Sequence, residues 1–393
     1  MPEREPKDVH TQPVARYASY LNPKHVGRII GFLAVVGGAI GLLVWLGVLP
    51  TRLGGSAEDQ SALRRQIEEL EQKVDVLPEY LADLDETQKE TLKAAYEEGR
   101  ALQLEGYEAQ DEEKHLEAIE RFTRALPLAE TDAQRASLHI LRGNSFFSVS
   151  QFESAEEAYG NAIELAAKLL EPSDANGVTA VALGNLGLIY ANRGDLARAE
   201  ENQRQALAIE RESGDRLGEA GSLGNLGNVY RMRGDLERAE DYYRQALAID
   251  REIGDRLGEA HAINNLGLIY TDLDDLKLAE EHHQQALEIH REIDNRLGEG
   301  NALGNLGLVY DHRGELERAE EYHREALAIH REIGARLDEA IDLANLGLLA
   351  ARRDAREEAC QLLKEAVATF DKIEMGGPGP DTLRAKLEEL GCG

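Results

Sequence analysis

The heptapeptide Gly184-Asn185-Leu186-Gly187-Leu188-Ile189-Tyr190 is the first of four closely similar copies in this chain of 393 residues. The other copies lie at residues 224–230, 264–270 and 304–310, and a more divergent fifth lies at 344–350. Each copy follows the previous one by forty residues. A fixed period of roughly 20–50 residues is typical of a solenoid, in which each unit buries its apolar face only against its neighbours. The four clean units span residues 180–339.

Each unit is predicted to fold as two helices joined by a tight turn. In the copy at 220–259, Gly234 ends the first helix and Asp235 caps the start of the second, which closes near Gly254. Gly227 and Ala239 predict a close approach of the two helices, because a larger side chain would overpack the crossing. The apolar face of the first helix recurs at three- and four-residue steps: Leu223, Leu226, Gly227 and Tyr230.

This residue order resembles the tetratricopeptide repeat. The forty-residue period and the Asn-Leu-Gly core resemble the subtype found in kinesin light chains and Pins-type polarity adaptors. The resemblance covers residues 89–375, about seven units, and implies an all-α, right-handed α-solenoid. Two units depart from the pattern, since Asp274 and Asp354 replace the turn glycine. Asp tolerates the left-handed conformation, so we expect the turn to survive there.

Weaker signals predict the ends of the array. A degenerate first unit is expected near 89–131, interrupted by an irregular acidic stretch at 106–115, and a second at about 136–175 that ends in a loop at 172–177. Residues 376–393 begin with a Gly/Pro break, after which Asp381 is expected to cap a short helix. That helix is expected to cover the open end of the stack through one apolar face: Leu383, Leu387 and Leu390.

The amino-terminal part predicts a membrane anchor. Residues 1–28 are polar and rich in proline, and residues 29–49 contain no charged side chain. A helix of this length spans about 31 Å, close to the thickness of the bilayer's hydrocarbon core. A buried soluble helix and a cleaved signal peptide are alternatives. Basic residues are denser before the segment than after it, which favours a cytoplasmic amino terminus and an extracytoplasmic array, periplasmic in a double-membraned bacterium.

Residues 50–88 are predicted to form a linker with a short coiled coil at 58–77. Apolar residues recur there at steps of four and three, which is typical of a coiled-coil seam: Leu63, Ile67, Leu70, Val74 and Leu77. This seam could join chains into a homo-oligomer. A single amphipathic stalk helix is the alternative.

The composition argues against several classes of function. A formal net charge of −30 argues against a nucleic-acid partner, which requires a basic face. The acidic excess is interpreted as a solvated outer face; attraction for basic peptides and adaptation to a salty milieu are alternatives. Cys360 and Cys392 are too few for a disulfide framework or a zinc site. No phosphate-binding loop, nucleophile elbow or zinc-protease motif occurs. We therefore expect no catalytic residues and no cofactor.

The histidines also invite a metal-site interpretation. His283 and His323 occupy the second-helix position that Tyr243 fills, and His290 and His330 are forty residues apart. Repetition of the unit explains this pattern better than metal coordination, so no metal site is expected.

The resemblance implies that the first helices line a concave groove that binds peptides. The candidate groove residues are Asn185, Asn225, Asn265, Asn305 and Asn345, with the more variable Asn228, Arg231, His261 and Asn264 beside them. Asn is a poor residue inside a helix, so its recurrence needs a reason. A carboxamide both donates and accepts, which suits gripping a peptide backbone. Hydrogen bonds between units would explain the asparagines equally well, and both interpretations stay open.

The sequence thus predicts a membrane-anchored scaffold that binds a protein or peptide partner in the groove and has no catalysis of its own. The alternative is a self-associating structural component of a cell-envelope assembly.

Overall fold

The computed structural model describes residues 93–94, 96–103, 112–129, 131–169, 171–373 and 378–392. Residues 93–94 and 96–103 are helical and precede the labelled elements. The labelled elements are α7 (Glu112–Ala125), the 3-10 turn η1 (Leu126–Leu128), α8 (Asp132–Ser148), α9 (Phe152–Ala166), α10 (Pro172–Asn192), α11 (Leu196–Ser213), α12 (Arg216–Met232), α13 (Leu236–Ile253), α14 (Arg256–Asp272), α15 (Leu276–Glu292), α16 (Arg296–His312), α17 (Leu316–Ile333), α18 (Arg336–Arg352), α19 (Arg356–Lys372) and α20 (Pro378–Glu389).

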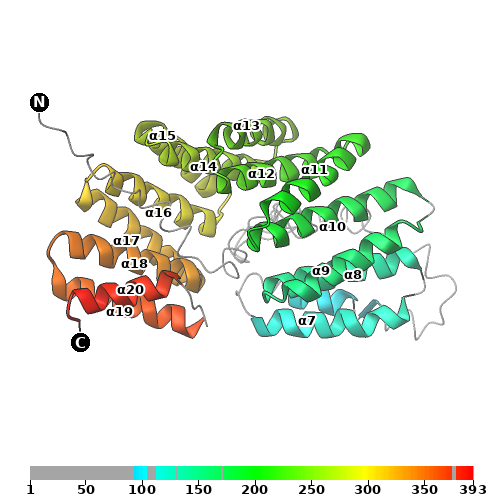
Figure 1. The fold of residues 1–393 in the computed structure, drawn as a ribbon, viewed down its shortest axis with the longest axis horizontal. Coiled ribbons are helices and arrows are strands. Elements are labelled where there is room, and N and C mark those ends of the chain that lie inside the picture. The colour runs from blue at the N-terminus through cyan, green and yellow to red at the C-terminus, as the bar shows by residue number, and fades with distance from the viewer. Residues whose placement is uncertain are drawn as a thin grey trace, which may run out of the picture.

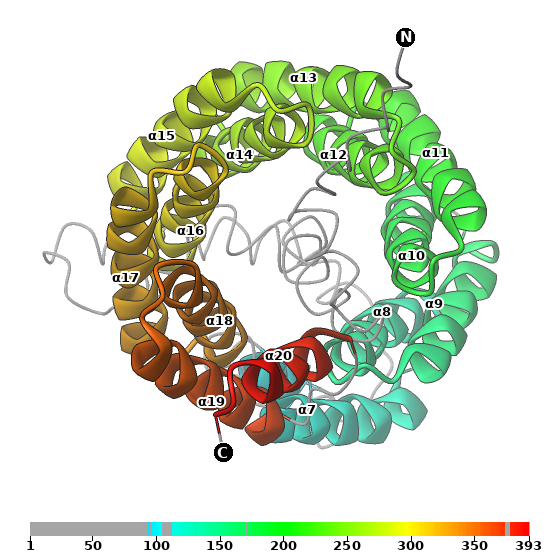
Figure 2. The ribbon, with the colours of Figure 1, turned by 60° about the vertical axis from the view of Figure 1, so that its left-hand side comes forward.

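The helices form an α-solenoid of stacked pairs (Figure 1). Six complete pairs run through the described part of the chain, from α8 and α9 to α18 and α19. Each helix packs mainly against its neighbours in sequence. Figure 2 shows the array winding around a central space, with the first helix of each pair facing that space and the second helix outside. The predicted all-α solenoid is therefore confirmed for these residues.

The unit boundaries lie where the turn residues predicted them. The Asp235 side chain accepts a hydrogen bond from the backbone N–H of Arg238 at the start of α13. Gly254 closes the same helix in the left-handed conformation, with φ 76°. Asp274 and Asp354 adopt the same region, with φ 61° and 58°, in place of the usual turn glycine. The two departures from the repeat therefore keep the turn, as expected.

The predicted close approach of the two helices is present in the unit at 220–259. The Tyr243 side chain on α13 lies directly against Gly227 on α12, and a Cβ added at Gly227 would lie 2.5 Å from its Cε1 atom. Ala239 and Tyr243 are both completely buried. The glycine is therefore needed because the Tyr243 ring fills the space of a side chain.

Polar ties join successive units on the outer side of the seam. The Glu156 carboxylate on α9 accepts hydrogen bonds from the Tyr190 hydroxyl at 2.7 Å and from the Arg193 guanidinium at 2.5 Å. Arg233, Arg313 and Arg353 repeat the arginine tie in later units. The unit at 260–299 is the exception, because Leu273 stands in the arginine position and is 51% exposed.

Three predicted boundaries were wrong. Residues 172–177 are the first turn and a half of α10, not a loop, because a proline at the first helical position has a suitable φ and no N–H to satisfy. The acidic stretch ends earlier than predicted, since α7 begins at Glu112. Asp381 lies inside the first turn of α20, paired with Arg384 at 2.9 Å, rather than capping the helix.

The carboxy-terminal helix covers the end of the stack, as expected. Leu383 is buried, and Leu387 and Leu390 pack against the last complete unit. A disulfide between Cys360 on α19 and Cys392 fastens this helix, with the two Cα atoms 5.5 Å apart. The sequence did not predict this pairing, because residues 32 apart give no sign of it until α20 folds back.

The predicted tail (1–28), membrane span (29–49) and linker with coiled coil (50–88) all lie outside the described residues, which begin at residue 93. Among the helices that the structure does describe, none is long and apolar enough to cross a membrane.

A pair of alanine substitutions in α12 tests the packing. Gly227→Ala should destabilise the array by about 1–3 kcal/mol, because the new methyl group displaces the Tyr243 ring. Gly224→Ala in the same helix should stabilise it by up to about 1 kcal/mol, since open space surrounds that position and alanine favours the helix. Urea unfolding followed by circular dichroism measures both. Equal effects of the two substitutions would contradict the packing account.

Candidate functional site

The surface that faces the central space is formed by one side of each first helix. On α12, α14 and α16, the half-buried positions recur at steps of three, one and three, while their neighbours are buried against other helices. We call these twelve residues the inner wall: Gly221, Gly224, Asn225, Asn228, His261, Asn264, Asn265, Leu268, Asn301, Gly304, Asn305 and Leu308. Six of them are asparagines.

The predicted asparagine ladder is divided into tied and untied members. Asn185 donates to the Asn144 side-chain oxygen, and Asn305 donates to that of Asn264, both at 3.0 Å and both across a unit boundary. Asn225 lies 3.5 Å from Gln203, at the limit of a hydrogen bond. For these members, the inter-unit hydrogen bond offered as an alternative is present.

Asn265 and Asn345 form no such bond with any described residue. Asn265 is half-buried on the inner wall. Asn345 is 5% exposed, and its side-chain oxygen is buried without a hydrogen-bond partner in the described part of the chain. The residue 41 positions earlier explains the difference. For Asn305 this residue is Asn264, which accepts its hydrogen bond, whereas for Asn265 and Asn345 it is Gly224 and Gly304. A glycine has no side chain to accept the bond.

Second-helix side chains hold three first-helix asparagines from behind. The hydroxyls of Tyr159 and Tyr243 donate to Asn144 and Asn228 at 2.8 and 2.7 Å. His283 fills the same position in the next unit, and its Nδ1 lies 2.9 Å from the Asn264 oxygen. Because that oxygen also accepts from Asn305, the Nδ1 must carry the proton.

Burial lowers the pKa of two histidines at the wall, His283 and His261. Burial lowers the pKa of His283 to about 3, and repulsion from His282 and Arg231 adds to this effect. His261 lies on the wall with its ring centroid 5.6 Å from that of His290, and burial lowers its pKa to about 4. The described residues contain no group of three or more His, Cys, Asp or Glu side chains placed to hold a metal ion.

Arg231 differs from the other predicted groove residues because it is engaged in an ion pair. Its Nε lies 2.7 Å from an Asp272 carboxylate oxygen at the carboxyl ends of α12 and α14. Asp311 and Arg352 form the reversed pair two boundaries further on. Both pairs lie at the edge of the wall and tie neighbouring first helices together.

Sequence reasoning missed the residues that support the ladder. Asn144 and Gln203 are buried polar residues that accept hydrogen bonds from Asn185 and Asn225. One signal was available: Gln203, His283 and His323 stand where Tyr159 and Tyr243 have an aromatic ring. Polar side chains at a buried position indicate a hydrogen-bonded partner on the facing helix.

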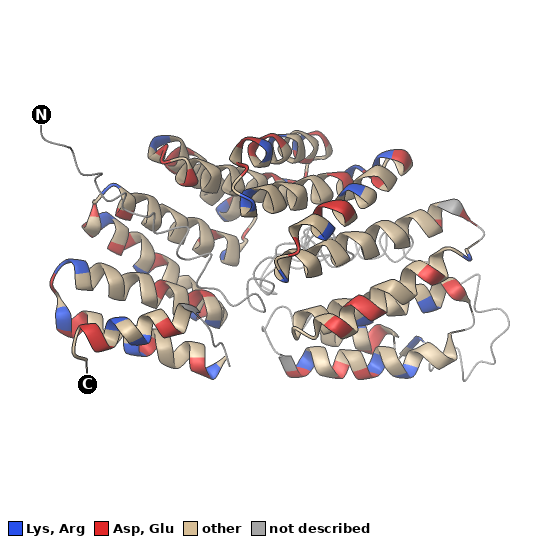
Figure 3. Ribbon diagram, in the orientation of Figure 1, with Lys and Arg blue, Asp and Glu red and all other residues tan. Residues whose placement is uncertain are grey.

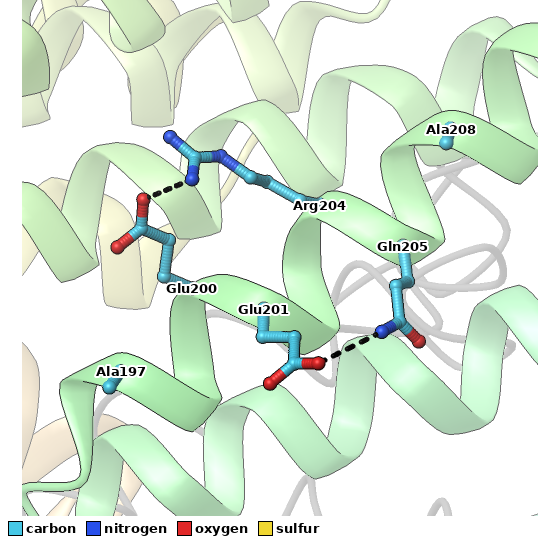
Figure 4. Close-up of a pocket in the computed structure, with 6 residues that line it drawn as sticks. All are labelled: Ala197, Glu200, Glu201, Arg204, Gln205 and Ala208. Atoms are coloured by element: carbon cyan, nitrogen blue, oxygen red, sulfur yellow. Dashed lines mark hydrogen bonds and ion pairs between the residues drawn. The ribbon is translucent and has the colours of Figure 1, made fainter.

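The outer surface is different in character. Figure 3 shows that charged residues are concentrated on the second helices and at helix ends. A hollow of about 410 Å³ lies over α11 and is lined by Ala197, Glu200, Glu201, Arg204, Gln205 and Ala208 (Figure 4). All six residues come from one helix, and Glu200 and Arg204 form an ion pair at 2.5 Å. The hollow is therefore open helix surface, not an enclosed site.

Two buried acids lie in the seams between units. Burial, and then repulsion from Asp255 and Glu259, raises the pKa of Asp250 to about 8. Burial likewise raises the pKa of Glu210 to about 7. Both residues end a second helix against the first helix of the next unit, so their ionisation bears on how the units stack.

Comparison with known proteins confirms the repeat type. Residues 178–252 and 258–332 match the tetratricopeptide repeat family. These stretches lie within the part of the array that the sequence predicted most clearly. A search of curated proteins finds no match.

Solved structures share the fold. Aspartyl phosphate phosphatase F from Bacillus subtilis is 14% identical, with a TM-score of 0.58, over 80% of this chain and 77% of that one. A Rap protein complexed with competence and sporulation factor is 18% identical, with a TM-score of 0.56, over 85% and 92%. A putative kinesin light chain from Podosopora anserina is 18% identical over 49% and 95%, with a TM-score of 0.41. The first two show the fold alone; the third is too loose a superposition to decide the subtype, which stays a prediction.

The substitution Asp250→Asn should weaken the pH dependence of stability. A group whose pKa rises on folding stabilises the fold fully below its ordinary value near 4, and that contribution is lost as pH rises through its folded value near 8. The wild-type chain should therefore lose about 2–3 kcal/mol between pH 6 and pH 9 through this carboxyl. Urea unfolding across this range measures the loss, which should be much smaller in the variant.

Asp241 on the exposed side of α13 provides the control. Asp241→Asn removes a carboxylate without affecting the seam and should keep the wild-type pH profile. An unchanged profile in Asp250→Asn would contradict the assignment of the pH dependence to Asp250.

Proposed function

We propose that this chain is a membrane-anchored scaffold that holds a partner protein through the inner wall and carries out no catalysis of its own. The observation that carries the proposal is Asn265. Its carboxamide is half-buried at the centre of the wall and has no hydrogen bond to any described residue. A polar group in this setting gains when a ligand supplies the missing donor and acceptor.

Several further observations support a binding role. Asn225 is held only at the limit of hydrogen-bond distance, so its carboxamide can also turn toward a ligand. Asn264 and Asn305 are tied to each other and fix the wall's geometry. A protein of the same fold has been solved complexed with competence and sporulation factor. That complex supports the proposal that this solenoid holds a partner. It does not identify which residues of this chain would contact the partner.

The location of the perturbed acids supports a non-catalytic scaffold. Glu210 and Asp250 are buried in the seams between units, where a substrate has no access. The acids that line the hollow over α11 lie on open helix surface, where Glu200 is paired with Arg204. Perturbed acids in a catalytic site would instead converge on a cleft.

We also propose that residues 29–49 span a membrane, that residues 58–77 join chains into a homo-oligomer, and that the array lies outside the cytoplasm. The charge distribution around residues 29–49 supports this orientation. The Cys360–Cys392 disulfide supports it independently, because disulfides form and persist mainly in oxidising compartments.

Two substitutions at equivalent positions test the groove. Asn265→Ala should reduce capture of the partner several-fold and leave unfolding by urea nearly unchanged, since no hydrogen bond is lost. Asn305→Ala should destabilise the array by about 1 kcal/mol, because it removes the bond to Asn264. Quantitative mass spectrometry of proteins captured by the detergent-solubilised chain measures the first effect. Circular dichroism during unfolding measures the second.

One outcome would overturn the groove proposal: capture by Asn265→Ala of the same proteins in the same amounts as the wild-type chain, at unchanged stability. Persistent oligomers of a chain lacking residues 1–78, detected by crosslinking, would then favour a self-associating envelope component.

The orientation has its own test. Protease added to intact cells should digest the array and leave a short membrane-bound fragment, since the array is proposed to lie outside the cytoplasm. Cells opened by detergent serve as the control for cleavage, and a cytoplasmic protein serves as the control for intactness. Protection of the array in intact cells, with digestion after lysis, would show either that the array lies in the cytoplasm or that an outer membrane shields it in the periplasm.

A further inference from the structure

The first helices lack charge where they face the central space. Residues 180–190, 220–230, 260–270 and 300–310 contain no Lys, Arg, Asp or Glu, in a chain of which 30% of residues are charged. Figure 3 shows the middle of α10, α12, α14 and α16 without charged residues, in contrast to the helix ends. The net charge of −30 is therefore carried by other surfaces.

The charged residues next to the wall are paired. Arg231 is paired with Asp272 at one edge, and Arg352 is paired with Asp311 two boundaries further on. The buried Asp342 carboxylate, beside Gly304, is paired with His330. His261, the one titratable residue of the wall, is uncharged at neutral pH because burial lowers its pKa to about 4.

What remains on the wall suits a polypeptide backbone. Of its six carboxamides, that of Asn265 offers a donor and an acceptor without a hydrogen bond to any described residue, and Asn225 is held only at the limit of hydrogen-bond distance. A Cβ added at Gly224 would meet no atom of the described residues within 4 Å, so a ligand can approach the helix backbone closely there. Leu268 and Leu308 are half-buried on the same surface and provide apolar contact.

We infer that the inner wall binds an extended, uncharged peptide segment with apolar side chains, taken from within a partner chain rather than from its charged terminus. The inference rests on the proposed groove function and specifies the ligand of that same site. The asparagines hold the peptide backbone, and Leu268 and Leu308 receive its apolar side chains.

Desolvation decides between a neutral and a charged ligand. A charged side chain placed against the wall loses its water and finds no opposite charge. The free-energy cost of this desolvation is larger for an ion than for a neutral polar group. A neutral segment avoids this cost. The acidic outer surface attracts basic peptides at long range, but such attraction is screened by salt and does not require the wall.

Selection from a random library provides the first test. The full-length chain, immobilised in mild detergent, is presented with random 15-residue segments displayed between two folded carrier domains. The selected segments should be depleted in Asp, Glu, Lys and Arg relative to the starting library. Fluorescence polarisation of a selected peptide should change less than about twofold between 50 and 500 mM salt, and one central Glu or Lys should weaken binding about tenfold or more.

Variants of the wall provide the second test. Leu268→Lys and Leu268→Gln both replace the apolar contact with a long polar side chain that favours the helix, so the difference between them reports charge. The lysine variant should bind the neutral peptide about tenfold more weakly than the glutamine variant. Gln205→Lys adds the same charge on the exposed face of α11 and should bind as the wild-type chain does.

The outcomes separate this inference from the proposed groove function. Selection of charged segments whose binding is weakened by Asn265→Ala would overturn the neutral ligand and leave the groove intact. Equal binding of the neutral peptide by the two Leu268 variants would also overturn the neutral ligand. Binding of basic peptides that disappears in high salt and ignores Asn265→Ala would place the ligand on the outer surface. The groove function and this inference would then both be wrong.

Discussion

The array depends on the contact between one second-helix side chain and a glycine of the first helix. Tyr243 packs on Gly227, and His283 packs on Gly267 in the same way. Because the glycine has no Cβ, the ring crosses the helix and its polar tip reaches the far side. There it meets a carboxamide, Asn228 or Asn264. In these two units, the contact between the helices thus also positions a hydrogen-bond acceptor at the inner wall.

This arrangement explains why the asparagines are not equivalent. A supported acceptor can take a second bond from the next unit, as Asn264 takes one from Asn305. Asn265 has the same place in its helix, but Gly224 stands where the acceptor would be. One position of the repeat can therefore serve stacking in one unit and remain free for a ligand in the next. The stacking interpretation holds for Asn185 and Asn305, and the groove interpretation stays a proposal for Asn265.

Much of this could be predicted because it depends on local chemistry that repeats. The turn at Gly234, the cap at Asp235 and the crossing at Gly227 follow from residues close in sequence. The start of α10 was mispredicted because Pro172 can begin a helix as readily as it can precede one. The division of the ladder depends on pairs 41 residues apart, and the disulfide depends on where α20 folds back. Neither can be predicted from one unit alone. Comparison of two units, however, shows Gly224 at the position 41 residues before Asn265, which indicates that Asn265 has no side-chain acceptor there.

The boundary between the units at 220–259 and 260–299 brings these features together. Leu273 replaces the arginine that ties other units, and Asn265 lacks an acceptor. The buried Asp250 carboxyl lies in the same seam and opposes stacking when it ionises. The ion pair of Arg231 with Asp272 spans this boundary at the wall's edge. The Tyr270 hydroxyl still donates to Glu240 across this boundary, so the two units stay joined without the arginine. A few substitutions within an otherwise repeated unit thus change which contacts hold one boundary together, and they leave the Asn265 carboxamide without a hydrogen bond to any described residue.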